Sequence, residues 1–152
     1  MTPTCRTTAL PSPTVSVTPP TLDALLTQCA HHHITVTTHP LPGTMRGAYH
    51  HTTRTITLRP GMPDWMAVPT LLHEMRHAWR GDDGHQAHRV EARIDRWVAT
   101  RLLDVGRYAA AEALVGPAVG ALAAELDVPA WVVVAYRDTL RTRSRTGRGS
   151  TM

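Results

Sequence analysis

The sequence predicts an α+β fold, in which a small antiparallel or mixed sheet is followed by helices. Alternating apolar and β-branched residues predict strands at residues 34–38, 47–50 and 54–58. Apolar residues at helical spacing follow from about residue 69 to residue 140. Strands that precede a run of helices are typical of α+β domains rather than of alternating α/β folds.

The first half of the predicted domain contains one helix and three strands. Thr21 is a suitable N-cap for a short helix with Leu22, Leu25 and Leu26 at helical spacing. The strand 34–38 comes next, and a turn at residues 40–43 follows it. Residues 47–50 and 54–58 predict a hairpin, whose second strand we expect to be a sheet edge that could pair with an extended peptide.

The second half is predicted to be helical. Pro69 suits the first turn of a helix that runs to about Trp79, and a long amphipathic helix starts at His88. Shorter helices are expected over residues 105–140, with breaks at Gly106, at residues 116–117 and at residues 128–129.

The chain length of 152 residues predicts a single domain, at residues 21–140. Residues 1–20 contain five Pro and six Thr and are predicted to be a disordered arm. Residues 141–152 contain four Arg and no acidic residue, so a disordered basic tail is expected there. No apolar run approaches 18 residues and no secretion signal is visible, which predicts a cytoplasmic protein without membrane contact.

The net charge of +4 comes entirely from this tail. The remaining twelve Arg are balanced by twelve acidic residues, so the domain itself is neutral, and we expect no sequence-specific binding of nucleic acid. Residues 121–140 have the pattern of a helix-turn-helix. The positions that would read base edges are Pro129, Ala130 and Val133, which cannot do so, and a packing or protein-docking role is predicted instead.

The sequence His73-Glu74-Met75-Arg76-His77 is an H-E-x-x-H motif, for which this composition predicts only about 0.02 chance copies. Two His four residues apart on a helix lie on one face and can reach the same Zn²⁺. Glu74 lies about 100° around the helix from His73, where it can accept a proton from a water on the metal without being a ligand.

A catalytic zinc site needs a third protein ligand. Downstream of the motif the candidates are Asp83, His85, His88, Glu91 and Asp95. Glu91 is favoured as the ligand, because Glu91 and Asp95 share a helix face and Asp95 can then orient a ligating imidazole. An alternative for Asp95 is a structural pair with Arg one turn away.

Other residues of the chain have side chains suited to the same chemistry. Residues 31–33 are three His near Cys29, but adjacent residues of an extended segment point to opposite sides, so an exposed loop is expected. Tyr49 and Tyr136 are candidates for stabilising an oxyanion, although a packed Tyr is the commoner outcome.

The segments TLLHEMRHAWRGDDG and VEARIDRWVATRLL resemble the ImmA/IrrE family of metallo-endopeptidases, especially small phage-encoded versions. The segment GAYHHTTRTITLRPGM is similar to the family's hairpin before the motif helix, and ALAAELDVPAWVVVAYRDTL to its closing helical segment. The resemblance covers about residues 22–140. Arg76 departs from it, since the family usually has Gly or another small residue there.

The resemblance implies a zincin-like fold with the sheet packed on the motif helix. It implies zinc bound by His73, His77 and Glu91, with Glu74 as the catalytic base. The expected function is a zinc-dependent endopeptidase that cleaves a helix-turn-helix repressor of a phage or mobile element and so regulates lysogeny. The alternative is a non-catalytic zinc-binding regulator or adaptor that docks such a repressor.

Overall fold

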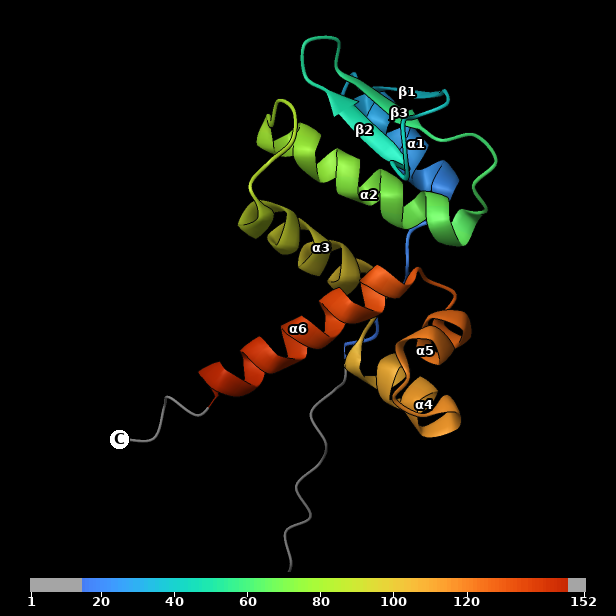
Figure 1. Ribbon diagram of the computed structural model, residues 1–152, viewed down its shortest axis with the longest axis vertical. Helices are drawn as coiled ribbons and strands as arrows, with labels where there is room; N and C mark the ends of the chain where they lie inside the picture. The colour runs from blue at the N-terminus through green and yellow to red at the C-terminus, as the bar shows by residue number, and fades with distance from the viewer. Residues whose placement is uncertain (1–14, 148–152) are drawn as a thin grey trace, which may run out of the picture.

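The computed structural model describes residues 15–147, which contain a three-stranded sheet and six helices (Figure 1). The strands are β1 (Thr35–Thr38), β2 (Gly47–His50) and β3 (Thr55–Leu58). The sheet order is β1-β3-β2, with β1 parallel and β2 antiparallel to β3. The α+β class and the hairpin of β2 and β3 are therefore confirmed.

The helices are α1 (Leu22–His31), α2 (Asp64–Arg80), α3 (His88–Leu102), α4 (Val105–Val115), α5 (Val119–Leu126) and α6 (Ala130–Thr146). Helix α2 packs against β2 and β3 on one side and against α3 on another, while α1 contacts α2 and β1. Helix α6 runs along α3 and contacts α5, which pairs with α4 at the far end of the molecule (Figure 1). The motif helix α2 thus lies at the centre of the half that contains the sheet.

The edge of the sheet differs from the predicted one. The prediction of an edge at residues 54–58 is wrong, because β3 pairs with a strand on each side and is the central strand. Ile56 of β3 is completely buried, as expected for a central strand. The edge strands are β1 and β2, on opposite sides of β3, and of these two it is β2 that packs against α2.

Helix α2 begins five residues earlier than predicted, at Asp64 instead of Pro69. Pro63 is its N-cap residue and Asp64 provides a negative charge in the first turn, where the helix dipole favours it. Pro69 therefore lies inside the helix, where its ring removes one backbone hydrogen bond. Its side chain is fully buried in the core, which offsets that cost.

The predicted disordered tail is wrong for residues 141–146, because α6 continues to Thr146. Hydroxyl groups of Thr142, Ser144 and Thr146 each donate to the carbonyl four residues earlier in this extension. The predicted break at Gly106 is also displaced: α4 starts at Val105, and Asp104 caps it. Residues 1–14 and 148–152, where the arm and the tail end were predicted, lie outside the described residues.

Residues 15–21, the described part of the predicted arm, have no regular secondary structure. The Val17 N–H nevertheless donates to the Asp104 carboxylate at 2.9 Å, so this segment contacts the start of α4. Across residues 15–147, no single helix combines the length and apolar character needed to cross a membrane.

Helices α5 and α6 form the predicted helix-turn-helix, with the turn at residues 127–129. Val133, one of the three positions that would face a base edge, is completely buried, as is its neighbour Val132. The start of α6 is therefore a packing surface, in agreement with the sequence analysis.

Candidate metal centre

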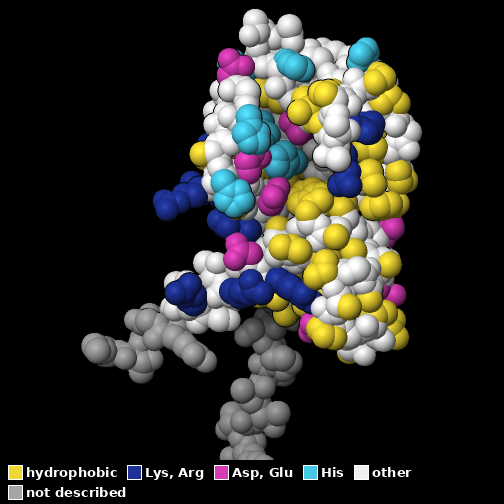
Figure 2. All heavy atoms as spheres, in the orientation of Figure 1, with side chains coloured by type: hydrophobic (Ala, Val, Ile, Leu, Met, Phe, Trp, Pro, Cys, Tyr) yellow, Lys and Arg dark blue, Asp and Glu magenta, His cyan; other side chains and the backbone are white. Residues whose placement is uncertain are grey.

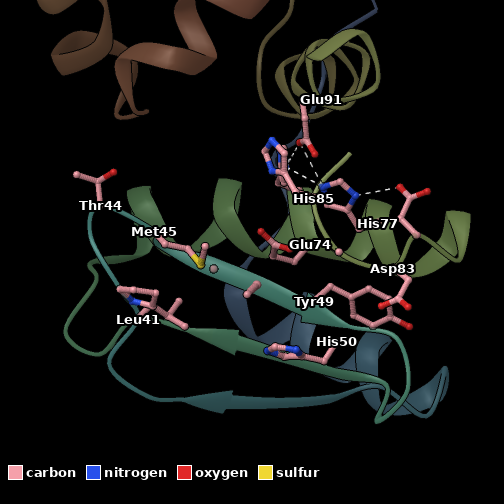
Figure 3. Close-up of a pocket in the computed structure, with 16 residues that line it drawn as sticks. Leu41, Thr44, Met45, Tyr49, His50, Glu74, His77, Asp83, His85 and Glu91 are labelled. Atoms are coloured by element: carbon pink, nitrogen blue, oxygen red, sulfur yellow. Dashed lines mark hydrogen bonds and ion pairs between the residues drawn. The ribbon is translucent and has the colours of Figure 1, made fainter. Parts of the chain in front are cut away.

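One turn of α2 brings His73 and His77 onto the same face, and Glu91 from α3 lies opposite them. The two Nε2 atoms are 3.1 Å apart. The Glu91 Oε2 atom lies 3.1 Å from the His73 Nε2 and 3.3 Å from the His77 Nε2. Figure 3 shows Glu91 pointing down from α3 towards His77. The structure thus brings the three predicted ligands together.

The second nitrogen of each imidazole is held by a carboxylate. The His73 Nδ1 atom lies 3.0 Å from the Asp95 Oδ1, the position expected for a residue that orients this ring. The His77 Nδ1 atom lies 2.9 Å from the Asp82 Oδ2. A carboxylate only accepts hydrogen bonds, so each Nδ1 can donate to its carboxylate, and in that neutral tautomer each Nε2 keeps a lone pair that can bind a metal ion.

Three electron-pair donors therefore converge on one point: two imidazole nitrogens and a carboxylate oxygen. In that tautomer the three atoms repel one another unless a cation lies between them, and their positions suit a shared metal ion. Within residues 15–147, these three residues are the one group of His, Cys, Asp and Glu whose atoms are close enough to share a metal ion.

Asp82 was not among the predicted site residues. Its position depends on Gly81, which ends α2 with φ 72° and turns the chain back, so that the Asp82 N–H donates to the His77 carbonyl. The Arg80 Nε also donates to the Asp82 Oδ2, at 2.9 Å. A Gly directly after the motif helix, followed by Asp, was the sequence signal that could have indicated this contact.

Glu91 presents one oxygen to the site, and its other oxygen, Oε1, accepts a hydrogen bond from the Gln86 N–H at 3.3 Å. It lies in the first turn of α3, where the helix dipole favours a negative charge. The other candidate ligands lie outside the group: Asp83 and His85 line the adjacent cavity, and His88 is exposed at the start of α3.

Glu74 is buried, with 8% of its surface exposed, and it does not belong to the converging group. Burial raises its pKa, an effect that nearby His73 and His77 oppose and that the charge of Glu91 reinforces. The Tyr49 N–H of β2 donates a hydrogen bond to this carboxylate. Glu74 therefore lies beside the ligands as a carboxylate of increased basicity.

Gly47 of β2 allows this close contact between the sheet and α2. A Cβ atom at this position would lie 2.8 Å from the Thr70 Cγ2 and 3.0 Å from the Glu74 Cγ. Any side chain here would consequently push β2 away from the helix or displace Glu74.

Several carboxylates make the site negative overall. Burial lowers the pKa of His73, but the hydrogen bond to Asp95 and the charges of Glu74, Asp95 and Glu91 outweigh it, so the pKa is raised. Burial raises the pKa of Asp82, but hydrogen bonds from His77 and Arg80 outweigh burial and lower it. The field that favours an imidazolium also favours a divalent cation.

The ligand group opens into a cavity of about 820 Å³. Figure 2 shows histidine and acidic side chains gathered around a hollow on this face, beside an apolar area. Tyr49 lines the cavity, whereas Tyr136 is buried against Tyr108 and does not line it, which leaves Tyr49 as the candidate for oxyanion contact. The Tyr49 hydroxyl is 3.3 Å from the His51 Nδ1.

Two aromatic contacts surround the motif. Trp131, at the start of α6, meets the His73 ring edge-on with 6.1 Å between ring centroids. The Arg76 guanidinium lies over the Trp97 ring, 4.9 Å from its centroid. Arg76 does not line the cavity, so its bulk and charge are kept away from the ligand group.

The His cluster at residues 31–33 is exposed and outside the metal-binding group, as expected. Cys29 is fully buried beside it, and burial raises the pKa of the thiol to about 11. A thiol of this kind is a core side chain rather than a ligand.

Comparison of the chain with protein-family models finds no match, and comparison with curated proteins finds none either. The geometry of the site and the motifs that form it are therefore the observations that indicate a function.

Proposed function

We propose that the protein is a zinc-dependent endopeptidase in which His73, His77 and Glu91 bind the metal and Glu74 is the base. The convergence of three metal-binding atoms, with both imidazole tautomers set by carboxylates, is the observation that supports this proposal most. A zincin-like arrangement, in which the sheet packs on the H-E-x-x-H helix, is part of the proposal.

Zinc fits the separations between the three atoms. Zinc bonds of about 2.0–2.1 Å in a tetrahedron place neighbouring ligand atoms about 3.3–3.4 Å apart. The separations in the protein are 3.1, 3.1 and 3.3 Å. Two imidazoles and one carboxylate are also a known ligand set of catalytic zinc, which keeps its fourth position for water or substrate.

A zinc ion in such a site acts as a Lewis acid that acidifies water and polarises a carbonyl. Glu74 would accept the proton of the attacking water and transfer it to the leaving amine nitrogen. The burial that raises its pKa suits both steps, because a carboxylate with a higher pKa is a better proton acceptor. The Tyr49 N–H would hold the carboxylate in place during this transfer.

The free edge of β2 supports an extended peptide substrate. The Arg59 N–H donates to the Arg46 carbonyl, and pairing alternates along antiparallel strands, so the backbone groups of Gly47 and Tyr49 point away from β3. The Tyr49 N–H is used by Glu74, which leaves the Gly47 backbone groups and the Tyr49 carbonyl for a peptide. A peptide aligned with this edge would lie across the cavity beside Glu74.

The resemblance to the ImmA/IrrE family suggests the biological substrate. We propose that the enzyme works in the cytoplasm and cleaves a helix-turn-helix repressor of a phage or mobile element. Cleavage of this partner, rather than broad digestion of unfolded proteins, is part of the proposal.

The Glu74→Gln variant tests the catalytic assignment. It should retain metal and fold and lose about 10²–10⁴-fold in single-turnover peptide cleavage, because only the proton acceptor is removed. Chelator should abolish cleavage by the wild type, and added zinc should restore it. Cleavage by Glu74→Gln at the wild-type rate would assign the base to another residue.

A second assay separates an endopeptidase from an adaptor and tests the substrate. The zinc-loaded protein is incubated with casein and, separately, with a repressor encoded near its gene. Cleavage of the repressor alone supports the proposal, and rapid digestion of casein with an intact repressor contradicts it. Repressor binding without any cleavage would indicate the adaptor.

A further inference from the structure

The cavity beside the ligand group has two chemically different walls. Asp82, Asp83 and His85 provide a polar wall near His77. The other wall, which we call the apolar wall, consists of Leu41, Pro42 and Met45 in the loop before β2. Figure 3 shows Met45 beside β2 on the side that faces Glu74.

Met45 is 46% exposed and lines the cavity. Single exposed apolar residues need no explanation on a convex surface. In a cavity that also contains a proposed metal centre, such a side chain is typical of a ligand pocket, where apolar groups surround a few polar ones. The flexible Met side chain can adjust to apolar groups of different shape.

Arg59, at the end of β3, fixes the shape of the apolar wall. Its Nε donates to the Met45 carbonyl at 2.9 Å, and its Nη2 donates to the carbonyls of Leu41 at 3.0 Å and Gly43 at 2.6 Å. The loop also contains a turn in which the Met45 N–H donates to the Pro42 carbonyl. A loop held in this way loses little conformational entropy when a ligand binds.

The position of the apolar wall along the chain indicates how far it lies from the bond that would be cleaved. Met45 precedes Gly47 by two residues, about 7 Å along an extended chain. Gly47 lies against Glu74, as its contacts with that side chain show. A peptide paired with β2 would therefore place a residue within about two positions of the scissile bond against Met45.

We propose that Leu41, Pro42 and Met45 form a subsite for one apolar side chain of the substrate, close to the scissile bond, and that Arg59 is the positioning residue of this subsite. This inference rests on the proposed endopeptidase function. It specifies the substrate class as extended peptides with a medium-sized aliphatic residue, such as Leu, at that position.

The test uses the zinc-loaded full chain and a set of three unstructured peptides that differ only in whether one residue beside the cleaved bond is Leu, Asp or Arg. The wild type should cleave the Leu peptide with kcat/KM about tenfold above that for the Asp peptide, as expected for a hydrophobic pocket. Met45→Asp should lose the preference for the Leu peptide and gain activity on the Arg peptide. Met45→Leu should retain the preference for the Leu peptide.

Arg59→Ala tests the positioning role. It should raise KM for the Leu peptide with little change in kcat, because the wall loses its shape while Glu74 and the ligands are untouched. Arg54→Ala is a matched control, since Arg54 also donates to loop carbonyls, those of His32 and His33, but outside the cavity. Met45→Asp keeps the test decisive if Arg59→Ala does not fold.

Failure of this inference can be distinguished from failure of the proposed function. Equal cleavage of all peptides, or a Leu preference that persists in Met45→Asp, would overturn the subsite and leave the endopeptidase. If no peptide is cleaved, binding of fluorescent versions to zinc-loaded Glu74→Gln decides instead. A Leu preference in binding that Met45→Asp removes supports the subsite, and equal binding overturns it.

Discussion

The two halves of the molecule use their partly buried polar groups differently. In the helical half, Arg107 donates to the carbonyls of Leu102 and Leu126, and Arg137 donates to the Tyr108 hydroxyl and the Pro117 carbonyl. These guanidinium groups join chain segments, and their hydrogen-bonding capacity is used for that purpose.

At the H-E-x-x-H motif, in the half that contains the sheet, the polar groups converge instead. His73 and His77 each have one nitrogen beside a carboxylate and direct the other at the same point as Glu91. The guanidinium groups of the helical half are paired within the fold, whereas these three side chains are close enough to share a metal ion. The proposed chemistry would therefore lie at the junction of α2, α3 and β2.

The largest expected effect is the loss of metal from the ligand group. His73→Ala and His77→Ala should each weaken zinc binding more than about a hundredfold, since changes to outer residues alone cost 10–100-fold. Glu91→Ala should weaken binding less and leave a two-His site. Calorimetric titration measures these affinities, with His50→Ala and His85→Ala, which line the same cavity, as controls. Full zinc occupancy of His73→Ala would contradict the assignment.

A smaller effect is expected from the carboxylates behind the ligands. Asp82→Asn and Asp95→Asn should lower zinc affinity about 10–100-fold, because an amide can hold the imidazole but stabilises its charge less. Asp138→Asn is the control, since Asp138 pairs with Arg96 on α3, away from the ligands. If Asp82→Asn and Asp95→Asn bind zinc as tightly as Asp138→Asn does, the carboxylates behind the ligands do not contribute to zinc affinity. The difference between the two halves would then be confined to the ligands.

Replacement of Gly by Ala should change the free energy of unfolding in opposite directions in the two halves. Gly47→Ala should lower the free energy of unfolding by about 1–3 kcal/mol, because its Cβ would clash with Thr70 and Glu74. Gly120→Ala in α5 meets no atom within 4 Å and should raise it by about 0.4–1 kcal/mol by restricting the unfolded chain. Denaturant titration measures both, and equal changes would show that β2 is not constrained by α2.

The smallest expected effect is a pH-dependent change in stability in the helical half. Backbone N–H groups of Arg107 and Val17 hold the pKa of Asp104 below its ordinary value of 3.8. The ionised form is favoured by folding, so this contribution is present above pH 3.8 and is lost as pH falls through the lower folded value. Asp104→Ala should therefore destabilise at pH 7 and converge with the wild type in strong acid. Asp104→Asn retains the cap and is the control.

The sequence predicted the ligands because their spacing is local. His73 and His77 need only one helical turn, and Glu91 and Asp95 need only a second helix that crosses the first. Asp82 is harder to predict, because its contact depends on the left-handed backbone conformation of Gly81, and the only sign of it in the sequence is a Gly followed by Asp after the motif helix.

The strand order could not be predicted from the hairpin alone. The parallel pairing of β1 with β3 joins residues about twenty positions apart, and it makes β2 the edge strand. The continuation of α6 through its Arg-rich end was also missed. Helix α6 is stabilised by packing against α3 over its preceding turns, and its last residues have good or moderate helix propensity. The helix therefore continues through these residues.

The distribution of the proposed ligands over two helices would couple a metal ion to the fold. His73 and His77 belong to α2 and Glu91 to α3, so an ion bound by all three would hold α3 against α2. By linkage, a contact that favours this docking would also favour binding of the ion. Helix α6 packs along α3 and touches His73 through Trp131. Binding of another protein to α6 would therefore change the affinity for the ion without any contact with the cavity.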